Sequence, residues 1–189
     1  MRGMAERATW SDTWRYVVGL AACLLVGWFA FVREAPVPLL SLVDLGIHEL
    51  GHMLTYVFPD LVTAVAGSAF QVLVPVGLAA YFWLVGRDRM ASGLCLAWAG
   101  TSAQQVAVYA ADAPYQRLVL LGGEHDWAFI LTRLGLLDRA GGLALAVRWL
   151  GLLLLMAGIG SCLWGLVRAH RDRRAPEVSS GPAWSAASR

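Results

Sequence analysis

Apolar residues in this chain are gathered into five long blocks that short polar segments separate. The blocks cover residues 16–32, 39–58, 61–85, 90–111 and 149–167. A helix of about 20 apolar residues is long enough to cross the ~30 Å apolar core of a bilayer. The pattern therefore predicts an all-α, polytopic transmembrane helix bundle of about five spans.

The segments outside the blocks predict the rest of the organisation. Residues 1–15 are polar and precede the predicted membrane domain, which covers residues 16–167. Residues 127–137 carry apolar side chains at helical spacing, which predicts a short amphipathic helix between the last two blocks. Residues 168–189 are basic and then rich in Ser, Ala and Pro, so we expect a disordered tail. Pro75 lies inside the third block and predicts a kink or partial unwinding.

The composition agrees with a protein that is embedded in a lipid bilayer. Of the 189 residues, 58% are hydrophobic and only 15% are charged, which differs strongly from soluble domains. The formal charge of +2, without a basic patch among aromatic residues, argues against binding of nucleic acid. The three cysteines lie in separate apolar blocks without a CxxC motif, as is typical of small buried side chains.

The positions of the arginines predict an orientation in the membrane. With five spans, the loop at residues 87–89 and the basic tail fall on the same side. The excess of positive charge in cytoplasmic segments makes that side the cytoplasm. The same arrangement places Arg15 on the outer side.

The second block contains the motif that carries chemistry, His48-Glu49-Leu50-Gly51-His52, which has the form HExxH. On a helix His48 and His52 lie one turn apart and face the same way, so both imidazoles can bind one Zn²⁺ at about 2 Å. Glu49 is placed beside them to take a proton from a metal-activated water and pass it to a leaving amine.

The motif belongs to a polar stripe, because Asp44, His48 and His52 follow one another at four-residue spacing. Each ionisable group in the centre of a membrane costs about 2.5–3.5 kcal/mol, so such a stripe indicates function. The histidines could instead bond to neighbouring helices, or bind haem, although haem ligands normally come from facing helices. Asp44 is interpreted as a partner of His48 or as a polar residue near the edge of the span.

An HELGH sequence inside an apolar helix resembles the site-2-protease-like intramembrane zinc metallopeptidases. With Gly67-Ser68-Ala69-Phe70-Gln71 and the later Gly-Glu-His-Asp-Trp element at residues 123–127, the chain also resembles small bacterial membrane proteins placed near those peptidases. The resemblance extends from residue 39 to residue 137, and only HExxH is specific by itself. It implies zinc as the cofactor, His48 and His52 as ligands, Glu49 as the catalytic base, and the bacterial inner membrane as the location.

The third ligand departs from that family, whose members take it from an Asp-Gly dipeptide that this sequence does not contain. A catalytic zinc needs a third protein ligand and an open position. The candidates are His125, Asp126, Asp112 and Glu124. We expect His125, because Asp126 suits the N-cap of the following helix and Asp112 suits the end of the fourth block. Gly122 and Gly123 would let this loop fold back toward the metal.

Three glutamines, Gln71, Gln104 and Gln105, are the other amides inside the apolar blocks. They could stabilise an oxyanion or bind a strand-like substrate. Such amides more often hold helices together, and both interpretations stay open.

These features predict a membrane-embedded zinc endopeptidase that cleaves a peptide bond in or near a membrane segment of another protein. The main alternative is a non-enzymatic membrane protein or scaffold that retains a metal site, which a closed shell of four ligands would favour. A third possibility is a metal-dependent hydrolase of lipids, since HExxH specifies an activated water and not the bond that it attacks.

Overall fold

The computed structural model describes residues 10–118 and 124–174, and within them all regular secondary structure is helical. This confirms the predicted all-α class. The helices are α1 (Trp10–Gly27), which continues as the π-helical turn η1 (Trp28–Val32), α2 (Leu40–Thr55), α3 (Asp60–Leu84), α4 (Arg89–Asp112), α5 (Asp126–Leu134), the 3-10 turn η2 (Leu137–Arg139) and α6 (Ala140–Arg174).

Three of the described helical segments are long and apolar enough to cross a membrane. They are Thr13–Val32, Asp60–Leu84 and Leu137–Arg174. The helix with the HExxH motif, α2, has 16 residues and is therefore about 24 Å long, less than the thickness of a bilayer core. The other expected span, α4, has 24 residues, but it buries polar side chains such as Thr101, Ser102 and Gln104 inside the bundle.

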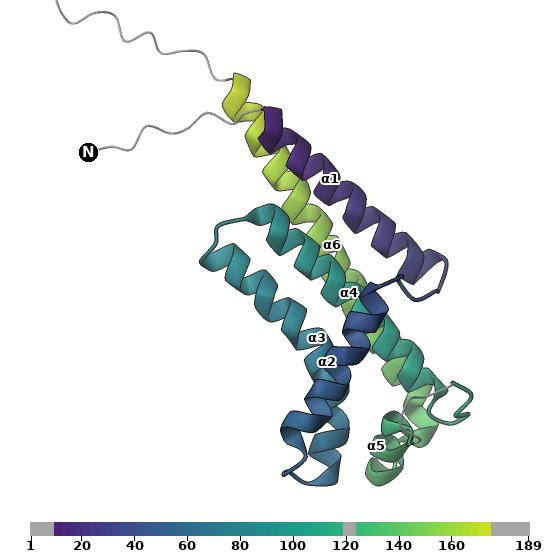
Figure 1. The fold of residues 1–189 in the computed structure, drawn as a ribbon. Coiled ribbons are helices and arrows are strands. Elements are labelled where there is room, and N and C mark those ends of the chain that lie inside the picture. Colours follow the sequence, from purple (N-terminus) through teal and green to yellow (C-terminus); the bar gives the residue numbers. More distant parts are fainter. Residues whose placement is uncertain (1–9, 119–123, 175–189) are drawn as a thin grey trace, which may run out of the picture.

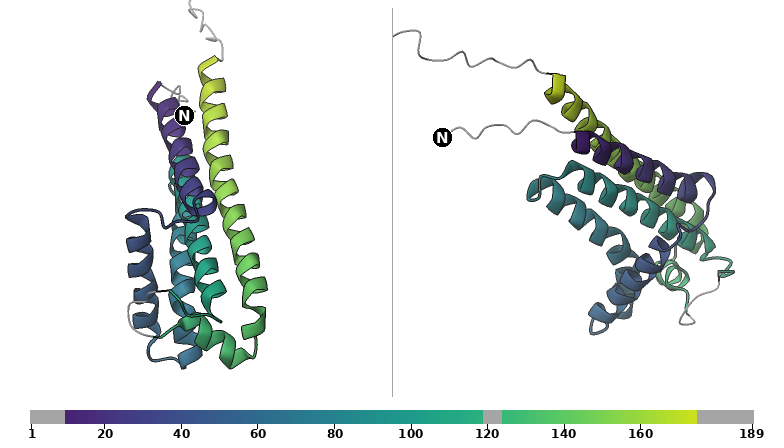
Figure 2. Two further views of the ribbon diagram at one scale, coloured as in Figure 1. Left: turned by 90° about the vertical axis from the view of Figure 1, so that its right-hand side faces the viewer. Right: turned by 45° about the horizontal axis from the view of Figure 1, so that its top comes forward.

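The long helix α6 is the element along which the bundle is organised (Figure 1). Helices α1 and α4 pack along α6, α3 packs on the other side of α4, and α2 packs against α3 at an angle to the rest (Figure 2). Glycines permit the close contact of α4 with α6. A Cβ added at Gly100 would lie 2.6 Å from the carbonyl oxygen of Gly151, and one at Gly93 would lie 2.8 Å from that of Gly158. Small residues at these positions let the two backbones approach.

The start of α1, the loop between α3 and α4 and the end of α6 lie at the same end of the bundle (Figure 1). An ion pair joins two of these segments, because a terminal guanidinium nitrogen of Arg15 lies 2.7 Å from Oδ2 of Asp88. The expected placement of Arg15 on the opposite side from residues 87–89 is therefore wrong. The expectation places three complete crossings between Arg15 and this loop. An odd number of crossings cannot return the chain to the end of the bundle from which it started.

Several predicted boundaries also change. The basic segment from Arg168 is not a disordered tail at its start, because α6 continues to Arg174; residues 175–189 lie outside the described part of the chain. At the other terminus, residues 10–15 already belong to α1. Residues 1–9 also lie outside the described part of the chain. The third helix passes through Pro75 as one α-helix, without the expected unwinding. The amphipathic helix ends early at Leu134, because Gly135 follows in the left-handed conformation with φ of 66°.

Candidate metal centre

The two histidines of the HExxH motif face the same point, as their spacing on α2 predicts. The Nε2 atoms of His48 and His52 lie 3.0 Å apart, and their rings meet edge to face. The His48 side chain is almost fully buried, whereas that of His52 is partly exposed. Two ring nitrogens at this distance can bind one ion together.

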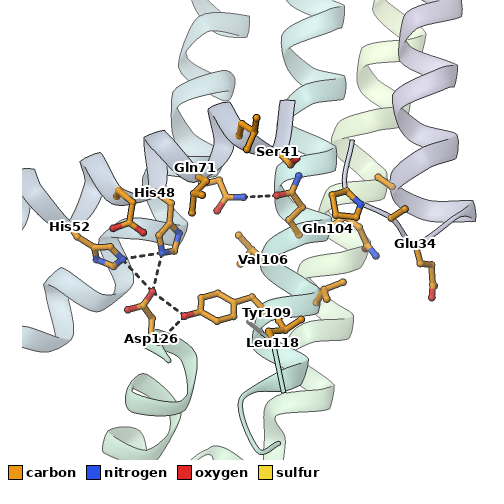
Figure 3. Close-up of a pocket in the computed structure, with 18 of the residues that line it drawn as sticks. Glu34, Ser41, His48, His52, Gln71, Gln104, Val106, Tyr109, Leu118 and Asp126 are labelled. Carbon is orange, nitrogen blue, oxygen red and sulfur yellow. Dashed lines mark hydrogen bonds and ion pairs between the residues drawn. The ribbon is translucent and has the colours of Figure 1, made fainter. Parts of the chain in front are cut away.

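The third group at this point is Asp126, the first residue of α5 (Figure 3). Its Oδ2 lies 3.0 Å from Nε2 of His48 and 3.3 Å from Nε2 of His52. Tetrahedral ligands at about 2.0–2.1 Å from a zinc-sized ion are about 3.3–3.4 Å apart. The three observed separations are close to that value. The donor set therefore fits one face of a tetrahedron, and the fourth position would be supplied by something other than these three side chains.

The orientation of His52 is fixed by the neighbouring helix. Its Nδ1 lies 2.8 Å from the backbone carbonyl oxygen of Thr63, which can only accept a hydrogen bond. The proton therefore sits on Nδ1, and the lone pair of Nε2 points to the centre, as is usual for metal-binding histidines. Thr63 also donates its hydroxyl to the carbonyl oxygen of Thr55 at 2.8 Å, which holds the end of α2 against α3.

Gly67 forms the wall of the site on α3. A Cβ added there would lie 2.5 Å from Nε2 of His52 and 2.7 Å from Nε2 of His48. On the α2 side of the same contact, a Cβ added at Gly51 would lie 2.6 Å from the carbonyl oxygen of Ala66. Because glycine occupies both positions, α2 can approach α3 closely enough to place the two ring nitrogens against its backbone.

We expect Gly67→Ala to lower metal affinity by about 100-fold, because the added methyl group competes with an ion for the same two nitrogen atoms. Relieving the clash requires the imidazole rings to rotate out of the centre or α2 to move away from α3, at a cost of about 1–3 kcal/mol in the free energy of unfolding. Isothermal titration with Zn²⁺ and thermal unfolding in detergent would measure both effects. Gly77→Ala is the matched control, because nothing lies within 4 Å of a Cβ at that position of the same helix. Equal metal binding by the two variants would contradict this account.

His125, which we expected as the third ligand, lies outside this group. Its Nδ1 accepts a hydrogen bond from the backbone N–H of Ala128 at 3.2 Å, so His125 is the N-cap of α5. The N-cap role predicted for Asp126 is therefore wrong, since α5 begins one residue earlier than expected and directs Asp126 to the histidines. Nε2 of His125 is buried and lies 3.4 Å from Oδ2 of Asp112.

Tyr109 on α4 contacts both His125 and Asp126. Its hydroxyl accepts a hydrogen bond from the backbone N–H of Asp126 at 3.0 Å and lies 3.4 Å from Oδ2 of the same residue. Its ring is stacked on that of His125, with 4.3 Å between the centroids. Tyr109 and His125 therefore hold the start of α5 so that the carboxylate of Asp126 faces α2.

The remaining candidates for the third ligand take other positions. Asp112 is the last residue of α4, as expected, and its carboxylate accepts hydrogen bonds from the backbone N–H groups of Arg117 and Leu118 at 2.9 and 3.0 Å. Glu124 is exposed and lines the cavity described below. Gly122 and Gly123, to which we assigned the folding back of the loop, lie outside the described residues.

A cavity of about 580 Å³ opens beside the three ligand atoms, which is a usual size for a ligand site. Glu49 lines it together with the three ligands, and Tyr109 lies on the α4 side. Figure 3 shows the ligands at one side of the cavity and Glu34 at the other, with Gln71 and Gln104 between them. The carboxylate expected to act as the base therefore shares one open space with the candidate ligands.

Asp44, the first member of the polar stripe, is completely buried and is not a partner of His48. Its carboxylate accepts hydrogen bonds from Nε1 of Trp98 and Oγ of Ser102, both at 2.7 Å, and from Nε2 of Gln105 at 3.0 Å. All three donors belong to α4. Asp44 thus ties α2 to α4 near the cavity.

The centre lies near the ends of the helices that surround it. Gly67 is seven residues after the start of α3 at Asp60, or about 10 Å along the helix. Tyr109 is three residues before the end of α4, or about 5 Å. Both positions are at the opposite end of α3 and α4 from the loop that contains Arg87, so the arginine-rich end and the centre are far apart.

Sequence reasoning missed the parts of the site that depend on contacts between distant segments. Each named position of the Gly-Ser-x-x-Gln element has a role. Gly67 lies against the two histidines, Ser68 accepts a hydrogen bond from Nε1 of Trp127 at 3.1 Å, and Gln71 lines the cavity. Comparisons with the models of known protein families, with curated proteins and with solved structures find no match to this chain.

Proposed function

We propose that this chain is a membrane-embedded zinc peptidase in which His48, His52 and Asp126 hold the ion and Glu49 moves the proton. The observation that carries the proposal is the convergence of three ligand atoms beside Glu49 on a cavity. Two imidazoles and one carboxylate form a ligand set typical of catalytic zinc, whereas structural zinc sites normally have four protein ligands. Among the described residues, no fourth His, Cys, Asp or Glu joins this group.

The side chains around the cavity divide the work of hydrolysis among them. The ion, when bound, supplies Lewis-acid activation of a water molecule. Glu49 accepts the proton of that water and returns it to the amine that leaves when the peptide bond breaks. Thr63 and Tyr109 keep His52 and Asp126 in place, which preserves the geometry during turnover.

We further propose that α1, α3, α4 and α6 cross the membrane, in place of five complete spans. Two crossings, by α1 and α3, bring the loop with Asp88 back to the side of Arg15, as their ion pair requires. Crossings by α4 and α6 then return the end of α6 to the same side. This arrangement gathers Arg15, Arg87, Arg89 and the basic end of α6 on one side, the cytoplasmic side of the inner membrane of a bacterium. The shorter α2 then lies inside the bundle at the opposite side without crossing.

The main alternative is a non-enzymatic membrane protein that binds a metal through the same residues. The cavity argues for the enzyme, because a scaffold needs no open space beside its ligands and no carboxylate such as Glu49 facing that space. A peptide is the preferred substrate over a lipid because three carboxamides line the cavity, from Gln71, Gln104 and Gln105.

The test uses the full chain, purified in detergent and reconstituted into vesicles with quenched fluorescent peptides that contain apolar membrane segments. We expect one zinc ion per chain and peptide cleavage that a chelator stops and added Zn²⁺ restores. His52→Ala should show neither bound zinc nor cleavage. Stoichiometric zinc without cleavage of any peptide in the panel would favour the scaffold, and a folded protein that binds no metal would refute both.

A further inference from the structure

The buried carboxylate of Asp44 gives a direction to a chain of hydrogen bonds that ends in the cavity. The Asp44 carboxylate accepts hydrogen bonds from Trp98, Ser102 and Gln105, and Gln105 donates through Nε2 at 3.0 Å. The Gln105 side chain must therefore present its oxygen, Oε1, on its other side. Nε2 of Gln71 donates to that oxygen at 3.5 Å, a long hydrogen bond that joins α3 to α4.

Because Gln71 donates its nitrogen to Gln105, its oxygen has no hydrogen-bond partner among the residues that the structure describes. The Gln71 side chain has used its nitrogen toward Gln105, and its Oε1 is neither paired nor sealed from the cavity. In Figure 3 this oxygen points into the cavity, between His48 and Val106. A hydrogen-bond acceptor is thus held in a fixed orientation near the candidate metal ligands.

Gln104 supplies the complementary group on α4. Only 3% of the residue is exposed, and its Oε1 is buried without a hydrogen-bond partner. Its Nε2 is not fully buried and makes no hydrogen bond to any residue that the structure describes, and the residue lines the cavity. The amide nitrogen therefore offers a donor to the same space. Leu42 and Leu45 also line this cavity, so part of its wall is apolar.

We infer that the part of the cavity lined by Gln71 and Gln104, here called the peptide arm, binds the backbone of an extended peptide. A secondary amide carries one N–H and one C=O, which match the free oxygen of Gln71 and the free nitrogen of Gln104. A peptide in a helix has already paired these groups, and a phospholipid ester has no N–H to give. This inference rests on the proposed peptidase function and specifies how the substrate would be held. Asp44 acts as a positioning residue, because it sets which end of Gln71 faces the cavity.

The probe that tests the inference is dansyl-Leu-Leu-amide, together with the analogue in which an ester replaces the amide between the two leucines. Binding to the full-length, metal-free protein in detergent is followed by fluorescence anisotropy, so the readout does not depend on zinc. We expect the wild type to bind the amide about tenfold more tightly than the ester, the effect of one well-made hydrogen bond. Gln71→Leu should remove this preference, whereas Gln71→Glu, which keeps acceptor oxygens, should retain it.

The other variants separate the roles of the three residues. Gln104→Leu should weaken the amide and the ester equally, because both probes keep the carbonyl group. Asp44→Asn places a carboxamide that can also donate, so Gln105 and Gln71 can both turn over. We expect a smaller preference for the amide, although residue 44 does not contact the probe. Gln116→Leu, an exposed glutamine outside the cavity, is the control and should bind both probes like the wild type.

The possible results distinguish this inference from the proposed function. An unchanged amide-to-ester ratio in Gln71→Leu, or no binding of either probe to the folded wild type, would overturn the peptide arm. If the probe behaves as expected but the protein binds no zinc or cleaves no peptide, the peptide arm is supported and the peptidase proposal fails.

Discussion

Glu49→Gln is expected to leave the zinc content of the protein unchanged and to lower its peptidase rate by about 10²–10⁴-fold, the usual contribution of general acid–base catalysis. The substitution keeps the size of the side chain but removes its negative charge and its ability to accept a proton. Glu49 contributes no atom to the His48–His52–Asp126 group, so the ion should still bind. Metal analysis and cleavage of a quenched membrane peptide, measured on the same preparation, check both parts.

The matched control is Glu124→Gln, because Glu124 is a second exposed glutamate that lines the same cavity. This variant should cleave at nearly the rate of the wild type. Comparable losses in the two variants would show that the total negative charge of the cavity matters, and not a proton transfer at Glu49. Full activity of Glu49→Gln would remove the base from the mechanism.

The second large effect concerns the third ligand. Asp126→Ala should weaken zinc binding by about 100-fold or more, since four-ligand zinc peptides bind with ~10–16 kcal/mol, or roughly 3 kcal/mol per ligand. His125→Ala should weaken it by at most about tenfold, because His125 caps α5 and supports Asp126 without facing the ion. Competition with a zinc-binding dye in detergent would measure both affinities.

Asp112→Ala serves as the control for removal of a carboxylate near the site, because Asp112 contacts His125 and no candidate ligand on α2. It should resemble His125→Ala. A greater loss of zinc in His125→Ala than in Asp126→Ala would restore the ligand set expected from the sequence and would contradict the arrangement of α5.

The local part of the site could be predicted from the sequence because it lies within one helix. His48 and His52 face the same way on any α-helix, and the apolar blocks are long enough to predict most of the helices. The third candidate ligand could not be predicted in this way. His125 and Asp126 are neighbours in the sequence, and the residue that faces α2 depends on where α5 begins, to within one residue.

The number of crossings was harder to predict for a similar reason. The pattern of apolar blocks makes α2 a span like the others, although its 16 residues are too few to cross a bilayer core. The ion pair of Arg15 with Asp88 joins residues that are far apart in the sequence. Nor does any local pattern show that Gly67 touches the two histidines, because that contact depends on how closely α2 and α3 approach.

The shallow position of the centre, about 10 Å from the start of α3, has a consequence for how the protein would acquire its ion. The arginine-rich end of the bundle faces the cytoplasm in the proposed orientation, so the centre opens toward the external compartment. Loading and exchange of zinc would then depend on the metal supply outside the cell. A chelator that cannot pass the membrane should strip the ion from intact cells and leave cytoplasmic zinc enzymes unaffected.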